Sequence, residues 1–213
     1  IILDSFKLSK DTDISGIIQM QSPYIFDRIT GKITLDNSII DSVLFSSISG
    51  DYIYNNGILT SEYIFFSSKD YTGDIKIHSL KDNENFVISG NMNFDEFITL
   101  PYVNNYGFKS FSGYMEFQWQ KSINNSELSA HVNVNDVILF NQFFPSLQAD
   151  IDIDIQDKEY SMKSSGVLEG WTYDPYVWDS LLFEIDYSNY DKSYYKLKAI
   201  SAIGDRFELH GEL

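Results

Sequence analysis

A seven-residue pattern of apolar and polar positions recurs along the chain. It reads apolar residue, Ser or Thr, Gly, any residue, apolar residue, any residue, apolar residue, and "ISGNMNF" from Ile88 is one copy. Further copies begin at Ile14, Ile29, Ile48, Tyr71 and Phe111. Because the side chains of a strand alternate between two faces, a period of two residues predicts β-strands rather than helices.

The spacing of the copies predicts how the strands follow one another. The glycine of the pattern stands at positions 16, 31, 50, 73, 90, 113 and 166, and Ala130 and Ala149 take its place in two degenerate copies. A new copy therefore begins roughly every twenty residues, which leaves room for a return strand between copies. This spacing predicts a long antiparallel meander.

A second, slower period lies over the first. A Pro-Tyr pair followed by Ile or Val occurs at Pro23, Pro101 and Pro175, and each pair follows a copy of the strand pattern. Repeats of this kind build elongated stacks in which each module contacts its neighbours. We expect residues 1–213 to form one continuous repetitive β segment of a longer protein, with modules near 14–87, 88–163 and 164–213.

The apolar residues of successive copies fall on one face of the expected sheet, and the polar residues fall on the other. This candidate groove consists of Ile18, Met20, Ile33, Leu35, Tyr52, Tyr54, Ile75, Ile77, Met92, Phe94, Met115, Phe117, Trp119, Val132, Val134, Ile151, Ile153 and Ile155. An antiparallel sheet must cover such a face with a second sheet, with itself by curling, or with a ligand. The chain has no convincing helical period to supply a cover. We therefore predict an all-β meander curled into a taco-like, U-shaped groove with an apolar interior, and the alternative is a β-sandwich with a dry core.

The recurring glycine lies on the apolar face of each copy. Glycine inside a strand marks a bend, a bulge or a close approach of two backbones. A row of glycines would let the sheet fold along a crease, and a tight sandwich corner explains the row equally well.

Composition and charge exclude several classes of function. The formal net charge is -16, so nucleic acid is a poor partner, because such binding depends on Lys and Arg at phosphates. The three histidines lie in separate strand copies, and "DIDID" from Asp150 lacks the Gly and Glu that a calcium loop needs. Phosphate-loop and nucleophile-elbow motifs are absent from the sequence. We expect no enzyme activity, no cofactor and no metal.

Two phrases resemble the AsmA-like and TamB family. In "GDYIYNNGILTSEYIFFSSKDYTGDIKI", from Gly50, a strand, an Asn-Gly turn and a second strand lead into the next Gly-initiated strand. "SGVLEGWTYDPYVWDSLLFEI", from Ser165, resembles the family's phrase of Gly, Leu, Gly and Asp-Pro, although Trp178-Asp179 stand where that phrase usually returns to Gly. The resemblance covers nearly the whole chain. The family is recognised by repetition more than by invariant residues, and it has no catalytic residues to carry over.

The resemblance implies a taco-like sheet with an apolar trough, in a protein anchored in the bacterial inner membrane and crossing the periplasm. It also implies a role in outer-membrane biogenesis, with phospholipid carried along the trough and an Omp85-type barrel as a partner of regions outside this segment. We therefore expect a segment of a lipid-transport protein. The alternatives are an extracellular repetitive β-sandwich that binds glycan or protein, and a purely structural solenoid or fibre segment.

Overall fold

The chain folds almost entirely into β-strands. The computed structural model describes residues 2–9, 12–21, 28–40, 43–79, 85–95, 108–139, 142–156, 159–173, 176–201 and 204–212. Strands account for more than half of the chain, and no helix occurs in these ranges. The three Pro-Tyr pairs at Pro23, Pro101 and Pro175 begin outside the described residues. The prediction of an all-β chain is confirmed.

Two compact units divide the chain, and each is described by itself. Unit 1 comprises Ile1–Met92 with Gln120–Ile123, and unit 2 comprises Asn93–Trp119 with Asn124–Leu213. The strands of the first half are β1 (Ile2–Ser9), β2 (Thr12–Gln21), β3 (Arg28–Ile40), β4 (Val43–Asn55), β5 (Ile58–Ser67), β6 (Tyr71–Ser79) and β7 (Phe86–Phe94). Those of the second half are β8 (Phe108–Lys121), β9 (Asn125–Leu139), β10 (Gln142–Gln156), β11 (Glu159–Tyr173), β12 (Tyr176–Ser188), β13 (Tyr194–Ile200) and β14 (Arg206–Glu212).

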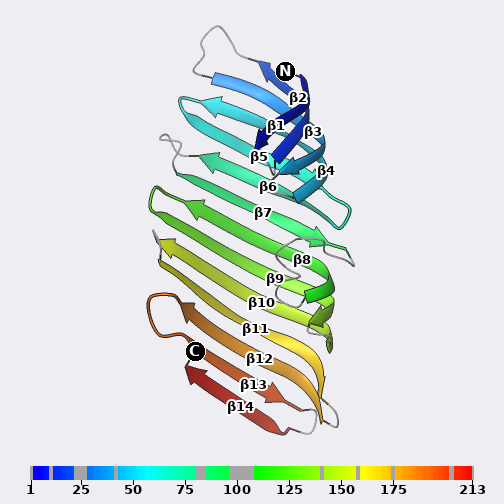
Figure 1. Ribbon diagram of the computed structural model, residues 1–213, viewed down its shortest axis with the longest axis vertical. Helices are drawn as coiled ribbons and strands as arrows, with labels where there is room; N and C mark the ends of the chain where they lie inside the picture. Colours follow the sequence, from blue (N-terminus) through cyan, green and yellow to red (C-terminus); the bar gives the residue numbers. More distant parts are fainter. Residues whose placement is uncertain are drawn as a thin grey trace. The chain divides into compact units, whose positions relative to one another are not determined.

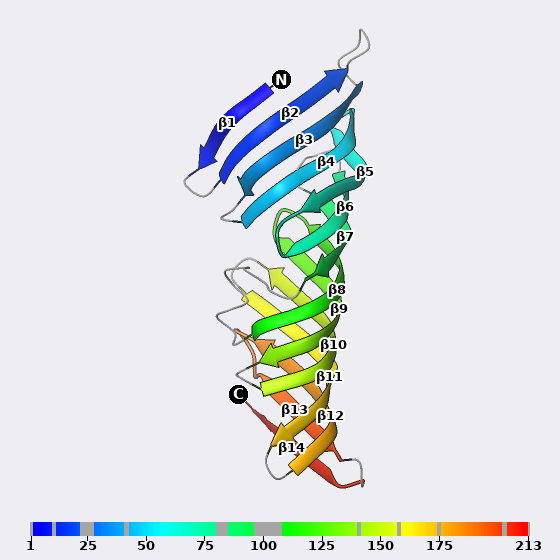
Figure 2. The same cartoon turned by 90° about the vertical axis from the view of Figure 1, so that its right-hand side faces the viewer.

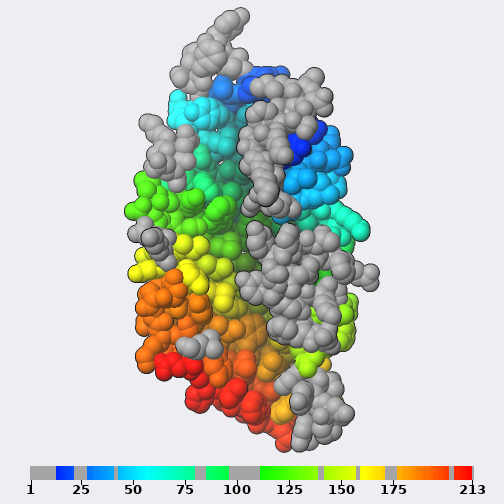
Figure 3. Space-filling model, in the orientation of Figure 1, coloured from blue at the N-terminus to red at the C-terminus, as the bar shows by residue number. Residues whose placement is uncertain are grey.

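The strands pair antiparallel in the order of the sequence, which is the predicted meander (Figure 1). In the space-filling view the described residues of unit 2 form bands that follow the sequence from green through yellow and orange to red (Figure 3). Most copies of the pattern occupy adjacent strands, so the expected return strand between copies is wrong. Gly31 of β3 and Gly50 of β4, for example, belong to neighbouring strands that pair directly. Only β5, between the copies at Gly50 and Gly73, is such a return strand among the described elements.

Strands in both units contain positions where the strand bends. In β3 the buried residues Leu35 and Ser38 enclose two exposed residues, and Asn37 between them has a φ of 49°. In β9 the buried residues Val134 and Val137 enclose a similar exposed pair, in which Asp136 has a φ of 53°. A left-handed residue reverses the alternation of the strand, so both flanking side chains point to the inner side.

Neighbouring strands of unit 2 carry the same interruption in register. Asn135 of β9, Ser146 of β10, Glu169 of β11 and Ser180 of β12 face one another in successive pairs. Gly170, next to Glu169, has a φ of 69°. Because the interruptions align, the strands bend together, and Figure 2 shows them curving at the right-hand edge of the view.

The most deeply buried side chains lie at these bends. Val137, Val134 and Ser38 are at most 1% exposed, and Leu35, Phe144 and Leu147 are also buried. The Ser38 hydroxyl accepts a hydrogen bond from the Ser15 backbone N–H at 3.1 Å, so it has a polar partner inside this core. The residues that flank the bends therefore belong to the core of each unit.

The glycines lie beside the bend rather than at it. A Cβ added to Gly16 would lie 2.2 Å from the Thr34 carbonyl oxygen, and one added to Gly166 would lie 2.2 Å from that of Gln148. Side chains of the next strand then cover the glycines: the Phe183 ring lies over Gly166. The close approach of backbones at these glycines is confirmed, and the bend lies at the left-handed residues beside them.

Asn37 provides a test of this bend. We expect Asn37→Val to destabilise unit 1 by about 1–2 kcal/mol, because a β-branched residue does not tolerate left-handed backbone, and Asn37→Gly to be neutral or better. Urea unfolding followed by circular dichroism measures both. Asp36→Val, at the neighbouring exposed position without a positive φ, is the matched control and should lose less stability. Equal losses for the two valine variants would contradict this explanation of the bend.

Candidate functional site: the apolar face of each unit

The apolar side chains of unit 2 form continuous rows across its strands. Val132, Ala149, Gly166, Phe183 and Leu197 are paired in succession from β9 to β13. Ile151 lies two residues after Ala149 on β10. Its row contains Ala130, Ser164, Ile185 and Tyr195. We call the surface made by these rows and their neighbours the apolar face of unit 2.

The structure places the predicted groove residues of unit 2 on this surface, by register or by strand alternation. They are Phe94, Met115, Phe117, Trp119, Val132, Val134, Ile151, Ile153 and Ile155. A Cβ added to Gly113 would approach Val134, so β8 contributes to the same face. The rings of Phe94 and Phe111 pack edge to face with centroids 5.3 Å apart.

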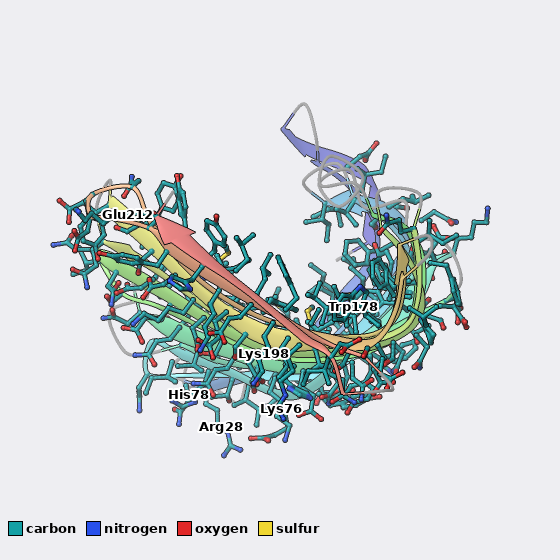
Figure 4. The ribbon with its side chains drawn as sticks, turned by 90° about the horizontal axis from the view of Figure 1, so that it is seen from below. Arg28, Lys76, His78, Trp178, Lys198 and Glu212 are labelled. Atoms are coloured by element: carbon teal, nitrogen blue, oxygen red, sulfur yellow. The ribbon has the colours of Figure 1, made fainter. Side chains whose placement is uncertain are left out.

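Unit 1 has an apolar face of its own. Ile33 of β3 pairs with Ile18 and with Gly50, and the row continues through Ile64 to Ile75. The predicted residues that share this face are Ile18, Met20, Ile33, Leu35, Tyr52, Tyr54, Ile75, Ile77 and Met92. Figure 4 shows Arg28, Lys76 and His78 pointing away from the opposite, outer side.

Most of these side chains are only partly covered. Of the predicted residues, Leu35, Phe94 and Val134 are buried and belong to the core, whereas Met20 is 53% and Ile155 is 43% exposed. Nearly all the others are of intermediate exposure. The apolar face of each unit is thus dry at the bend and accessible farther out, which suits an elongated apolar guest.

Sequence reasoning missed part of this surface. Ile64, Leu128, Met162, Phe183, Ile185, Tyr187, Tyr195 and Leu197 complete the rows. Several lie on strands without the glycine that marked the copies. The signal was the plain alternation of stretches such as "LLFEIDY" and "YYKLKAI", which has the same period of two residues.

The apolar face of unit 2 ends at an aromatic rim near the turn between β10 and β11. This rim consists of Trp119, Ser126, Tyr160 and Tyr187. The Trp119 indole N–H donates to the Ser126 hydroxyl at 2.7 Å, and the Tyr160 and Tyr187 hydroxyl oxygens are 3.2 Å apart. Such side chains suit a boundary with water because their bodies are apolar and their tips are polar.

Tyr52 plays a similar part in unit 1. Its ring covers Gly31, and its hydroxyl donates to the Gln19 carbonyl oxygen at 3.2 Å. Burial raises the pKa of the Tyr52 hydroxyl above its ordinary value, so the group stays neutral at physiological pH. It therefore adds a polar contact to this face without adding charge.

The outer, polar face of unit 2 carries the charges. The "DIDID" stretch is part of strand β10. His131 Nδ1 lies 2.7 Å from Asp150 Oδ1, and the Ser129 hydroxyl donates to Asp152 Oδ1 at 2.7 Å. A depression of about 650 Å³ on this face spans β10 to β14, where Lys163 lies 3.7 Å from Asp186. Acidic and basic residues both line this depression. No group of side chains suited to a metal ion occurs among the described residues.

Figure 4 shows that the strands of unit 2 curve, with Trp178 on one arm and Glu212 at the tip of the other. In the described part of the chain, no helix has the length and the apolar character that crossing a membrane would take.

No protein-family model, curated protein or solved structure matches this chain.

Proposed function

We propose that the chain is a lipid-carrying segment of a cell-envelope protein, in which the apolar faces hold the acyl chains of phospholipids. The observation that carries this proposal is the partial exposure of ordered apolar rows in both units. The resemblance to the AsmA-like and TamB family supplies the setting. That setting is a periplasmic segment of a protein anchored in the inner membrane, which supports outer-membrane biogenesis with an Omp85-type barrel as a partner.

The energetics of an acyl chain favour such a guest. Each methylene removed from water contributes about 0.8 kcal/mol, so a chain in contact with several rows is held firmly. Successive rows present similar Ile, Leu, Val and Phe side chains, as in the row from Val132 to Leu197. A guest that moves by one strand therefore exchanges one apolar surface for another, which permits sliding without a deep free-energy minimum.

The partial exposure argues against a closed sandwich. In a dry core, Ile33, Ile75, Ile151 and Phe183 would be buried, yet all four are of intermediate exposure. A purely structural segment would also have no reason to keep exposed residues such as Met20 on the apolar face. An extended, partly exposed apolar surface is typical of binding sites for lipids or for other macromolecules.

The test is native mass spectrometry of the purified chain. We expect one or more diacyl lipids to remain bound. Ile151→Asn, on the apolar face of β10, should lower the lipid-bound fraction severalfold, and the matched control Asp152→Asn, on the outer face of the same strand, should leave it unchanged. A chain that carries no lipid after purification and takes up none from vesicles would contradict the proposal.

A further inference from the structure

Strand β14 comes last in the strand order, and among the described elements only β13 pairs with it. That pairing is regular over its whole length, whereas β1, the first strand in the order, pairs with β2 through two register shifts. Natural proteins protect the open edge of a sheet with bulges, prolines or charges that point inward. Strand β14 has none of these three features, so its open edge is suited to pairing with another strand.

The turn before β14 indicates which backbone groups face this edge. The Ser201 N–H donates to the Asp205 carbonyl oxygen at 3.0 Å. Because hydrogen-bonded pairs alternate along an antiparallel ladder, the backbone groups of Phe207, Leu209 and Gly211 point to β13. The backbone groups that point to the open edge are those of Arg206, Glu208, His210 and Glu212.

Among the described residues, Gly211 of β14 pairs with a neighbour on one side only. That neighbour is Tyr195 of β13, whose side chain lies over the glycine. Farther inside the sheet, a glycine of the repeated pattern can pair with apolar side chains on both sides, as Gly50 does with Ile33 and Ile64. A strand added to β14 would therefore fit best with an apolar side chain opposite Gly211.

The sequence of β14 complements itself. In an antiparallel pair of two β14 strands centred on Leu209, Phe207 of each copy lies opposite Gly211 of the other copy. The outer side of this pair then sets a basic residue opposite an acidic one at each position, Arg206 with Glu212 and His210 with Glu208. Arg206 takes part in none of the ion pairs found among the described residues. Cross-strand pairs of opposite charge stabilise a sheet.

Charge disfavours the neighbouring registers of the same pair. The register can shift only by steps that keep the edge-facing residues opposite one another. A pair centred on Glu208 would set the two Glu208 carboxylates against each other, and a pair centred on His210 would set Glu208 opposite Glu212. Like charges directly opposite each other are destabilising, so the register centred on Leu209 is selected.

We infer that two copies of this chain associate edge to edge through antiparallel pairing of their β14 strands, centred on Leu209. Phe207 and Leu209, which are 49% and 43% exposed in the single chain, gain apolar neighbours at this junction. Opposite residues of an antiparallel pair lie on the same face, so the apolar face of unit 2 continues into the second copy. The inference goes beyond the proposed function, because the pairing needs no bound lipid.

A single cysteine tests the register, because the chain has no cysteine of its own. Leu209→Cys places two thiols where opposite Cα atoms are about 4.5 Å apart, a distance that a disulfide can span. We expect mild oxidation to yield a covalent dimer of this variant, and about fivefold less dimer of Phe207→Cys, which faces Gly211 instead of its own copy. Equal yields from the two variants, or no dimer of a folded Leu209→Cys chain, would overturn the inference.

Charge variants test the association without a crosslink. Analytical ultracentrifugation of the parent chain at increasing concentration should show a monomer–dimer equilibrium. Arg206→Glu should weaken dimerisation about tenfold because it sets acids opposite each other, and Arg206→Glu combined with Glu212→Arg should restore it. Lys163→Glu, which makes the same change of charge on the outer face of β11, should leave the equilibrium unchanged.

Two results of the ultracentrifugation would overturn the inference. One is a parent chain that remains monomeric at every concentration, and the other is a charge swap that fails to restore the dimer. Neither result would bear on the proposed function, because lipid binding to a single chain is measured separately by native mass spectrometry. Conversely, a chain that dimerises through β14 and binds no lipid would contradict the proposed function alone.

Discussion

Gly166→Val is expected to unfold unit 2, or to destabilise it by about 3 kcal/mol or more. The new Cβ would lie 2.2 Å from the Gln148 carbonyl oxygen and 2.7 Å from the Phe183 ring, and the first of these atoms belongs to the backbone of a paired strand. Overpacking against side chains alone costs about 1–3 kcal/mol, and a displaced backbone adds the loss of strand pairing. Denaturant unfolding followed by circular dichroism measures the change.

Two further variants make this experiment specific. Gly166→Ala adds the same Cβ without the branch, so it should destabilise the unit to a smaller extent. Ser165→Val adds a branched side chain to the exposed outer face of the same strand, where valine suits a strand, and should be tolerated. If Gly166→Val unfolded at the same denaturant concentration as the parent, the close approach of β10 and β11 at this position would be wrong.

Met115→Arg is expected to abolish most lipid binding while the chain stays folded. Met115 lies on the apolar face of β8 and is only partly covered, so a long arginine side chain can reach solvent. We expect a loss of stability below about 2 kcal/mol and a reduction in lipid crosslinking of about tenfold, because the charge removes apolar surface in the middle of the face. The same reasoning applies to Met92→Arg on the apolar face of unit 1.

Two arginine variants serve as controls for Met115→Arg. Val134→Arg places the charge at the bend, in a side chain that is 1% exposed, and should unfold unit 2, because an unpaired charge in a sealed core costs several kcal/mol. Glu116→Arg, on the exposed outer side of β8, should affect neither folding nor crosslinking. If Met115→Arg unfolded the chain as completely as Val134→Arg, the apolar face would be a closed core.

The alternation of apolar and polar residues was sufficient to predict the strands and their two faces. A period of two fixes which side chains share a face, so Ile151 and Ile153 could be placed on the same face as Val132 and Val134 without knowledge of the register. The register depends on backbone pairing and turn lengths, which the pattern does not encode. For that reason the number of strands per copy was predicted wrongly.

The curling of the sheet was predicted, but the position of the bend was not, because its signal is a brief break in the pattern. Asp36-Asn37 and Asn135-Asp136 each insert two polar residues between inward-facing ones, and in β11 Glu169-Gly170 follows the buried Leu168. Asn, Asp and Gly are the residues that tolerate left-handed backbone, so such pairs inside a strand predict a reversal of its faces. The glycines of the repeated pattern drew attention instead, although they serve the close approach of strands beside the bend.

Crosslinking of a photoreactive diacyl phosphatidylcholine to the parent chain, followed by peptide mapping, tests the central claim most directly. The probe carries its reactive group near the end of an acyl chain. We predict crosslinks to residues of the apolar faces, such as Met115, Ile151 and Phe183, and none above background to outer residues such as Glu116, Asp152 and Glu184. Crosslinks confined to the outer faces, or no crosslinks in a folded chain, would contradict the account.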